Sequence, residues 1–271
     1  MRYTFLASSF FLIFASFVEA RPAHCCCFQG FYGGAAVGVA SNHARADVRS
    51  GFSNLFSIAN ASRIDSSRIQ EVYDTVPLLD LHLGWGKRCS SCFYFGARLG
   101  VTFSSFEMSA MSDTQFNILG GSVFQNILQD TVQISMNTAE GTFDFKPGYI
   151  LGERTMLFGI VGAAYNQQCL KGFSDVIYSS DALNFRIENR LAVERTRTTV
   201  GLRGGFGLEQ KINHCMSVSF MYVYTHYNCP VEVSGAVPIQ TLFGEIQDGH
   251  DGIFKAHVNK QVTSMGCSYY F

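Results

Sequence analysis

Residues 93–104 read FYFGARLGVTFS, with an apolar side chain, in most cases a large one, at every second position. The positions between them carry glycine, a hydroxyl group or a charge. Such alternation is typical of a β-strand with two different faces, because successive side chains point to opposite sides. In a soluble sheet the bulky face covers a core, whereas in a barrel that crosses a bilayer it faces lipid and the small, polar face fills the lumen.

Seven further segments extend this pattern along the chain. They are residues 31–39, 79–85, 143–151, 156–166, 198–208, 218–224 and 265–271. A tilted strand needs about 9–11 residues to cross a bilayer. The facing of 156–166 stays open because both of its parities are apolar, and Pro147 predicts a local bulge because it removes a donor from the ladder.

The connections between these segments alternate in length. Short connections lie at 86–91, 152–155 and 209–214, and long ones run over about 41–71, 105–140, 167–195 and 228–254. An up-and-down barrel has this order when tight turns close one end and long loops cover the other. The sequence therefore predicts an all-β fold, an eight-stranded antiparallel up-and-down transmembrane β-barrel with four long external loops.

The composition excludes several other classes of protein. Charged residues make up 15% of the 271 residues, and the net charge is −1. A nucleic-acid-binding protein would need a basic stripe, and a disordered chain would need more charge, so neither class fits.

Residues 1–20 have the features of a secretory signal peptide. Arg2 supplies a positive charge, the apolar run over 5–18 is too short for a transmembrane helix, and 18–20 read VEA, which suits cleavage after Ala20. We expect export of residues 21–271 as one barrel domain.

Seven charged or imidazole side chains fall on the small-residue faces of the segments. They are Asp80, His82, Arg98, Asp144, Lys146, Arg197 and Arg203. A buried charge must be paired, and an eight-stranded barrel is only wide enough to be filled by side chains. We expect an ion network that fills the lumen; a narrow gated ion path and catalysis by Asp80 and His82 are the alternatives.

Two histidines in the long connections stand near groups that a hydrolase could use. His226 lies near Glu232, and His250 lies between Asp248 and Asp251. Neither belongs to a convergent triad, the chain has no Gly-x-Ser-x-Gly elbow, and 248–252 has too few ligands for a calcium loop. We therefore predict no catalytic residue, no metal site and no cofactor.

Nine cysteines are an unusual feature for a small barrel. They are Cys25, Cys26, Cys27, Cys89, Cys92, Cys169, Cys215, Cys229 and Cys267. An oxidising compartment permits disulfides, and all except Cys267 are candidates, although the CxxC spacing of Cys89 and Cys92 also suits a metal or redox pair. In the predicted topology Cys169 and Cys229 lie opposite the other candidates, too far away to bond with them. Because nine is odd, one thiol is left over or pairs with another chain.

The chain resembles the small eight-stranded outer-membrane β-barrels of Gram-negative bacteria, the outer-membrane protein A-like and surface-adhesin barrel group. The resemblance is carried by residues 30–34, GFYGG, and by residues 268–271, SYYF. It implies an outer-membrane location and a terminal signal for the barrel-assembly machinery, formed by Phe271, Tyr269 and Cys267, where Cys267 replaces the usual bulky residue. The number and placement of cysteines are similar to those in the cross-linked envelopes of chlamydia-type bacteria, which implies disulfide links to other envelope proteins.

The expected function is that of a structural and surface interaction protein. Its partners would be outer-membrane lipid, the barrel-assembly machinery, and other envelope proteins or a host surface ligand, but no nucleic acid. The alternatives are a small porin-like channel for ions or solutes and, third, a lipid-modifying enzyme. Apolar residues in the long connections could form a binding surface or pack inside. These residues are Phe52, Leu55, Phe56, Phe116, Phe124, Ile127, Leu128, Leu242 and Phe243.

Overall fold

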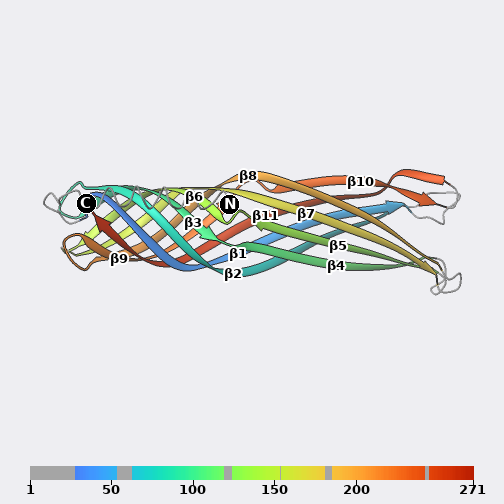
Figure 1. Ribbon diagram of the computed structural model, residues 1–271, viewed down its shortest axis with the longest axis horizontal. Coiled ribbons are helices and arrows are strands. Elements are labelled where there is room, and N and C mark those ends of the chain that lie inside the picture. The colour runs from blue at the N-terminus through green and yellow to red at the C-terminus, as the bar shows by residue number, and fades with distance from the viewer. Residues whose placement is uncertain (1–27, 54–62, 119–123, 153, 181–184, 242–243) are drawn as a thin grey trace, which may run out of the picture.

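The computed structural model describes residues 28–53, 63–118, 124–152, 154–180, 185–241 and 244–271. These residues form an elongated all-β structure in which eleven antiparallel strands run roughly along the long axis (Figure 1). Within the described ranges there is no helix of the length and apolarity needed to cross a membrane. The predicted signal peptide lies outside the described residues.

The strands differ greatly in length. Their bounds are β1 Gly30–Ser53, β2 Arg63–Arg88, β3 Phe93–Ser104, β4 Phe106–Ile118, β5 Phe124–Met136, β6 Ala139–Leu151, β7 Thr155–Ser180, β8 Phe185–Lys211, β9 Met216–Tyr227, β10 Val231–Thr241 and β11 Gly244–Tyr270. The five longest, β1, β2, β7, β8 and β11, have 24 to 27 residues each. They run through both halves of the molecule, which we call the near half, containing the C-terminus, and the far half (Figure 1).

In the near half, backbone pairing runs continuously from strand to strand. β1 pairs with β2, β2 with β3, β3 with β6 and β6 with β7. The pairing continues from β7 to β8, β9 and β11, and β11 pairs with β1. Every pair is antiparallel, as an up-and-down arrangement requires.

In the far half, the same long strands are divided between two four-stranded sheets. One contains β10, β11, β1 and β2, and the other contains β4, β5, β7 and β8. Their facing sides share one apolar core, with Val48 and Phe254 from the first sheet and Met108, Ile134 and Leu170 from the second. We call this part the far sandwich.

The prediction of four long external loops is wrong for most of their length. β4, β5 and β10 lie within the expected loops, and the long strands extend into them. The cause is visible on β1, where odd-numbered side chains point outward throughout. The outward residues are apolar up to Val39 and polar or charged from Ser41 to Arg49, whereas inward apolar residues occur in both parts, as at Ala36 and Val48, so the alternation continues after the outward apolar residues end.

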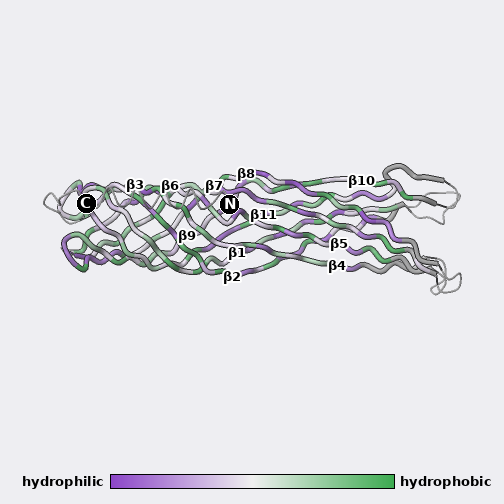
Figure 2. Tube along the Cα trace, in the orientation of Figure 1, coloured by the Kyte–Doolittle hydropathy of each residue, from purple (hydrophilic) through white to green (hydrophobic). Residues whose placement is uncertain are grey.

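Figure 2 shows polar and apolar residues interspersed along the strands in both halves. The facing of 156–166, which the sequence left open, is now clear: Leu157, Val161 and Tyr165 are exposed, whereas Met156 and Ile160 are buried. The predicted bulge at Pro147 is wrong, because the pairing of β6 with both neighbours keeps one register on either side of this residue.

One glycine of the far sandwich is required by close packing. A Cβ atom at Gly172 of β7 would lie 2.3 Å from Cδ2 of the buried Phe254 ring on β11. No such contact is tolerated without movement of the ring. Glycine therefore allows the two sheets to approach each other here.

Candidate functional site

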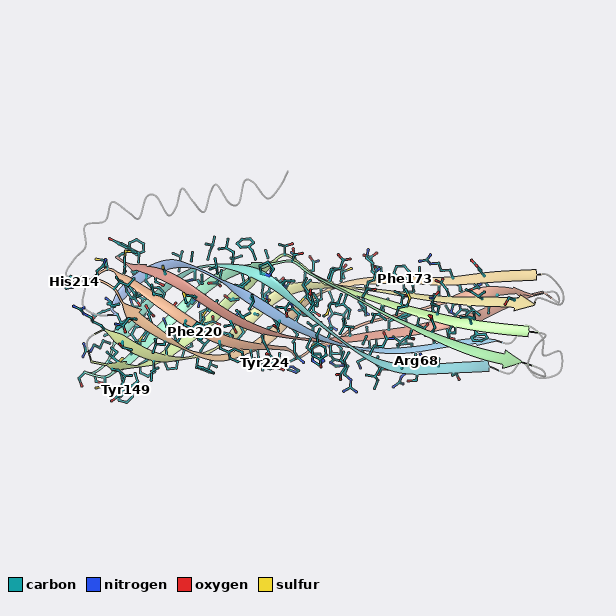
Figure 3. The ribbon with its side chains drawn as sticks, turned by 90° about the horizontal axis from the view of Figure 1, so that it is seen from below. Arg68, Tyr149, Phe173, His214, Phe220 and Tyr224 are labelled. Atoms are coloured by element: carbon teal, nitrogen blue, oxygen red, sulfur yellow. The ribbon has the colours of Figure 1, made fainter. Side chains whose placement is uncertain are left out.

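An apolar belt surrounds the near half. Its large apolar side chains point outward and are exposed, from Phe31 and Trp85 to Leu99, Tyr165 and Phe220. In Figure 3, Tyr149, Phe220 and Tyr224 lie in this half, whereas Arg68 and Phe173 lie in the far half. The full belt consists of Phe31, Val37, Val39, Leu79, Trp85, Phe93, Phe95, Leu99, Phe103, Phe143, Phe145, Tyr149, Leu151, Leu157, Val161, Tyr165, Val200, Leu202, Phe206, Leu208, Phe220, Tyr224, Met265 and Tyr269.

The interior of the near half holds buried charges beside apolar side chains such as Met156, Ile160 and Met221, and the first layer of charges is centred on Glu209. The Lys146 ammonium donates to Glu209 at 2.5 Å, and the hydroxyls of Ser217 and Tyr270 donate to it at 2.5 and 2.7 Å. The Lys146 Nζ atom also lies 4.1 Å from the centre of the Phe158 ring. The Glu209 carboxylate is therefore compensated by one cation and two hydroxyls.

A second layer is centred on Asp80. Arg98 forms an ion pair with Asp80, and the Thr102 hydroxyl donates to the same carboxylate at 3.0 Å. His82 Nδ1 lies 2.9 Å from Asp80 Oδ1, and His82 Nε2 lies 3.1 Å from the Ser268 hydroxyl. Strands β2, β3 and β11 contribute to this layer, so it ties together strands that are distant in the sequence.

A third layer is centred on Glu140. Lys260 Nζ donates to it at 3.0 Å, the Tyr227 hydroxyl donates at 2.5 Å, and Arg203 lies 3.4 Å away. Arg203 also pairs with Asp144, with Nε 2.9 Å from Oδ1. Arg203 of β8 thus bridges the two carboxylates of β6, and Lys260 of β11 adds a second cation at Glu140.

These layers fill the interior instead of lining an open path. Asp80, Arg98, Lys146, Arg203 and Lys260 are all at most 6% exposed. Charges at this depth are stable only when they are paired, because the desolvation cost is several kcal/mol per ion. Beyond the third layer the core of the far sandwich begins, so polar packing passes directly into apolar packing.

Six of the seven predicted lumen residues lie in this interior, and Arg197 does not. Its side chain is exposed, and Nη1 donates to the Pro230 carbonyl at 3.4 Å. The pairing of β8 with β9 ends at Gly201, so Arg197 lies at a sheet edge of the far sandwich. Glu140, Glu209, Lys211 and Lys260 are also buried, and the sequence pattern did not predict them. Glu140 and Glu209 fall in the predicted connections, although Glu209 continues the alternating pattern of β8.

A polar cluster bridges the two sheets of the far sandwich. Ser50 donates to Asp130 at 2.8 Å, and His250 lies 2.9 Å from Ser174 Oγ through Nε2 and 3.0 Å from Asn189 Oδ1 through Nδ1. Burial lowers the pKa of His250 to about 4. Burial also raises the pKa of Asp130, although hydrogen bonds from the Ser174 and Ser50 hydroxyls act to lower it.

The two loop histidines have different environments. His250 is buried and not a solvated loop residue, whereas His226 is exposed, with Nδ1 2.6 Å from Asn259 Oδ1. Ser174, although it touches His250, is fully buried. This geometry favours a role in holding the sheets together over attack on a substrate.

The described cysteines lie at two levels of the molecule, of which only the first is at an end. Cys89, Cys92 and Cys215 lie in the turns of the near end, whereas Cys169 and Cys229 lie in the far half. Cys89, Cys92, Cys169, Cys229 and Cys267 are free thiols. The disulfides stay a prediction, and Cys25, Cys26 and Cys27 lie outside the described residues.

Cys92 lies in a polar environment. Its pKa is lowered by hydrogen bonds from Ser91 and Tyr149 and, to a smaller extent, by the nearby Arg88 cation. A lowered pKa increases the fraction of the nucleophilic thiolate.

The apolar residues of the expected loops do not form a described surface patch. Phe52 and Leu128 are fully buried in the far sandwich, and Ile127 is half-buried. Phe116 and Phe124 lie in β4 and β5. Leu55, Phe56, Leu242 and Phe243 lie outside the described residues.

The terminal motif closes the near end. The rings of Tyr269 and Phe271 lie 5.4 Å apart, and the Phe271 amide donates to the Phe31 carbonyl at 2.9 Å. Cys267 points outward beside them. Recognition of this motif by the assembly machinery stays a prediction.

No family model and no curated relative matches the chain. Among solved structures it is similar to Ail, the attachment invasion locus protein of Yersinia pestis, at 10% identity and a TM-score of 0.31, covering 89% of this chain and 99% of that one. It is also similar to outer membrane protein OprG of Pseudomonas aeruginosa, at 12% identity and a TM-score of 0.45, covering 92% of this chain and 99% of that one. Outer membrane protease OmpT of Escherichia coli matches at 10% identity and a TM-score of 0.30, covering 90% of this chain and 97% of that one. The chain thus resembles small outer-membrane β-barrels, without a likeness that assigns a role.

Proposed function

We propose that the chain is an integral protein of the bacterial outer membrane, in which the near half crosses the bilayer as a closed eight-stranded barrel. The far sandwich then stands outside the cell and serves as a structural and interaction surface. The observation that carries this proposal is the change of the outward residues along single strands. On β1 they are apolar up to Val39 and polar or charged from Ser41 to Arg49, so the surroundings of the strand change from apolar to aqueous between them.

The dimensions of the apolar belt support a bilayer-spanning role. On β1 it extends from Phe31 to Val39, and on β8 from Val200 to Leu208. Each interval matches the roughly 9–11 residues of a tilted transmembrane strand. Continuous pairing from β1 around to β11 leaves no unpaired edge in this region, which the interior of a bilayer requires.

The packing of the interior favours a closed barrel rather than a channel. Three layers of paired charges occupy the lumen, and an apolar core lies directly above them. A conducting path would need water-exposed groups along its whole length, but the charged side chains of the layers are nearly fully buried. The function then resides in the surface of the far sandwich and in the cysteines of the periplasmic turns, which we propose to link the barrel to other envelope proteins.

Labelling of natural thiols on intact cells tests the topology. After disulfides are reduced and the reductant is removed, a membrane-impermeant maleimide should modify Cys229 of the far half on intact cells and Cys89 only after the outer membrane is opened. Cys229→Ser is the matched control that identifies the labelled site. Equal labelling of Cys89 on intact cells would contradict the proposed orientation.

Two further measurements separate the alternatives. Refolded protein in planar bilayers should give no steady openings, whereas openings abolished by Arg98→Gln or Arg203→Gln would establish the channel. A mass shift of the lipid fraction on expression would establish a lipid-modifying enzyme. For the interaction role, cells that display the protein should adhere to host surfaces or matrix better than cells that display none, and equal adhesion would count against it.

A further inference from the structure

A pair of cysteines lies in the turn between β2 and β3 at the near end. Cys89 and Cys92 have the CxxC spacing, and they are the first and last residues of this turn. The Cys89 amide donates to the Phe93 carbonyl at 2.9 Å, so the chain reverses its direction here. A reverse turn keeps residues three apart within about 7 Å, which is the Cα separation that a disulfide needs. The two thiols can therefore be joined without a change in the strands.

Hydrogen bonds hold the backbone of the turn in place. Ser90 Oγ accepts from the amides of Cys92 and Phe93 at 3.4 and 3.2 Å. The Cys92 carbonyl accepts from the Ile150 amide of β6 at 2.7 Å. The turn is therefore attached to the neighbouring strand, and the position of Cys92 relative to β6 is defined.

Two hydroxyl groups lie around the Cys92 sulfur. Ser91 Oγ lies 3.5 Å from Cys92 Sγ. The second hydroxyl belongs to Tyr149 of β6, which forms a hydrogen bond with Cys92. Tyr149, labelled in Figure 3, pairs with Phe93, and the two rings lie 5.6 Å apart, so the ring is held beside the turn. A donor from another strand is thus directed at this thiol.

A cation is held against the same turn. Arg88 Nε donates to the Ser90 carbonyl at 3.0 Å, and Nη2 donates to the Ser91 carbonyl. Hydrogen bonds from Ser91 and Tyr149, and then this positive charge, lower the pKa of Cys92. The thiolate is the form of cysteine that attacks a disulfide, so these surroundings favour attack by Cys92.

The Cys89 sulfur has different surroundings. Cys89 is exposed, and its Sγ donates to the Lys87 carbonyl at 4.0 Å, whereas Cys92 is half-buried among donors. One thiol of the pair therefore faces donors and the other faces an acceptor. Such an asymmetry suits a pair in which one thiol attacks and the other resolves the bond that is formed.

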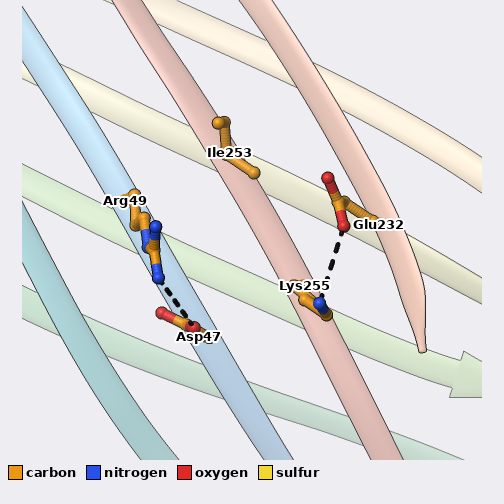
Figure 4. A pocket seen from close by; sticks show the side chains of 5 residues that line it. All are labelled: Asp47, Arg49, Glu232, Ile253 and Lys255. Carbon is orange, nitrogen blue, oxygen red and sulfur yellow. Dashed lines mark ion pairs between the residues drawn. The ribbon is translucent and has the colours of Figure 1, made fainter.

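A thiol of the far half provides a contrast. Cys169 of β7 is half-buried like Cys92, but its Sγ donates to Glu194 at 3.3 Å, so a carboxylate and not a cation lies beside it. Several cations of this half pair with carboxylates, and the shallow pocket of Figure 4 contains two such pairs. They are Asp47 with Arg49 at 3.9 Å and Glu232 with Lys255 at 3.8 Å. Cys169 therefore serves as a matched thiol without the surroundings of Cys92.

We propose that Cys89 and Cys92 form a thiol–disulfide exchange site, at which Cys92 attacks a disulfide of another envelope protein and Cys89 resolves the mixed disulfide. This inference rests on the proposed function and deepens it, because it requires the near turns to face the periplasm. A link to a partner through Cys92 then lasts only until Cys89 reacts, so the link is reversible.

The exchange consists of two balanced steps. The Cys92 thiolate, having given its proton to water, forms a bond to one sulfur of the partner's disulfide, and the other sulfur leaves and takes a proton from water. The Cys89 thiol then loses its proton to water and attacks Cys92 Sγ, which releases the first sulfur of the partner as a second thiol. The partner's disulfide is thereby reduced by two electrons, and the pair is oxidised by two electrons to a disulfide.

Reaction of the purified full chain with oxidised glutathione in detergent tests the proposal. After the protein is reduced and the reductant is removed, Cys89→Ser should accumulate a glutathione adduct on the Cys92 peptide, as read by mass spectrometry. In the parent protein this adduct should be at least about tenfold less abundant, because Cys89 converts it into a bond between Cys89 and Cys92. The matched control Cys229→Ser removes an exposed thiol of the far half and should behave like the parent protein.

The rates test the surroundings of Cys92. In Cys89→Ser, Cys92 should form its adduct at least about threefold faster than Cys169, since a larger thiolate fraction outweighs the lower nucleophilicity of the thiolate. Tyr149→Phe keeps the ring and removes the hydroxyl, so in the same background it should slow the reaction of Cys92 and leave that of Cys169 unchanged.

Several outcomes would overturn the proposal. Equal amounts of the Cys92 adduct in the parent protein and Cys89→Ser would show that Cys89 does not resolve the bond. Equal rates for Cys92 and Cys169 would show that the turn does not activate Cys92. A disulfide between Cys89 and Cys92 that resists millimolar reduced glutathione in the folded protein would be a structural cross-link. If Cys89→Ser does not fold, Cys89→Ala gives the same comparison.

Maleimide labelling of cells separates this inference from the function on which it rests. If Cys89 is labelled only after the outer membrane is opened, but Cys92 shows no faster exchange, only the exchange site is refuted. If the purified protein exchanges as expected, but Cys89 is labelled on intact cells, the proposed orientation is refuted and with it the periplasmic partner.

Discussion

Replacing Glu140 by glutamine tests whether the filled lumen depends on paired charges. The Glu140 carboxylate is 1% exposed and touches Lys260 at 3.0 Å, Arg203 at 3.4 Å and the Tyr227 hydroxyl at 2.5 Å. With an effective dielectric constant of about 20, the attraction between Lys260 and Glu140 at 3.0 Å is about 5 kcal/mol before desolvation is counted. Arg203 keeps Asp144, but Lys260 loses its carboxylate partner and keeps neutral acceptors such as the Ser104 hydroxyl at 3.2 Å. We therefore expect Glu140→Gln to lower the free energy of unfolding by about 3–5 kcal/mol.

Urea unfolding of the protein in lipid vesicles measures this loss. Trp85 is the only tryptophan of the chain and lies in the apolar belt, so its fluorescence reports removal of the barrel from lipid. Adding Lys260→Met to Glu140→Gln removes the unpaired cation and should recover part of the stability. The control Glu232→Gln breaks an exposed pair with Lys255 and should cost less than about 1 kcal/mol. A Glu140→Gln protein as stable as the control would refute the reasoning.

Three other predictions follow from the far sandwich and the near turns. Gly172→Ala should destabilise the far sandwich by about 1–3 kcal/mol because its Cβ would strike the Phe254 ring, and proteolysis of the far half on intact cells should then become faster while lipid insertion is unchanged. The pKa of His250 in the folded protein is about 4, below its ordinary value of 6.5. As the pH falls, the unfolded chain therefore takes up the proton first, and the free energy of unfolding should decrease by up to about 3 kcal/mol between pH 6.5 and 4. The raised pKa of Asp130 has the opposite effect on stability, but this effect is common to the parent protein and to His250→Gln. The difference between the two pH profiles of stability therefore isolates His250. Parallel profiles would contradict the burial of His250 as a neutral group. Cys92 should react with iodoacetamide several-fold faster than Cys89 at pH 7, as followed by peptide mass spectrometry, and Arg88→Gln should slow it; equal rates in parent and variant would show that the Arg88 cation has no influence.

The sequence allowed the near half to be predicted well, since its outward residues are large. Alternation of Phe, Leu and Tyr with glycine is easily recognised, and all eight segments lie in strands. The lumen charges were found by the same reasoning, because Asp80, Arg98 and Asp144 interrupt small-residue faces at the correct parity. Arg197 has the same parity as Arg203, but the pairing of β8 with β9 ends between these two residues. The end of such a pairing has no signal in the local sequence.

The far half could not be predicted in the same way, because its inward residues include small as well as large apolar side chains and its outward residues are mostly polar. On β1 the inward side chains include Ala44 and Ala46, which are too short to mark an apolar face in the sequence. The region therefore resembles a polar loop although its period of two is intact. A search for alternation of charge against alanine or valine, regardless of residue size, would have found β10, where Val231 and Val233 flank Glu232.

The two halves solve the same packing problem in opposite ways on shared strands. Below the level at which the outward residues change from apolar to polar, the proposed lipid surroundings accept the bulky outward side chains, and the interior holds paired charges beside buried apolar residues such as Ile160. Above it, water accepts the polar side chains, so the interior can be apolar and the sheets can approach closely at Gly172. The outward residues change from apolar to polar after Val39 on β1, after Tyr165 on β7 and before Val200 on β8. Because Tyr165 and Val200 pair with each other, the change on β7 and β8 occurs at one level of the ladder, as the proposed membrane surface requires.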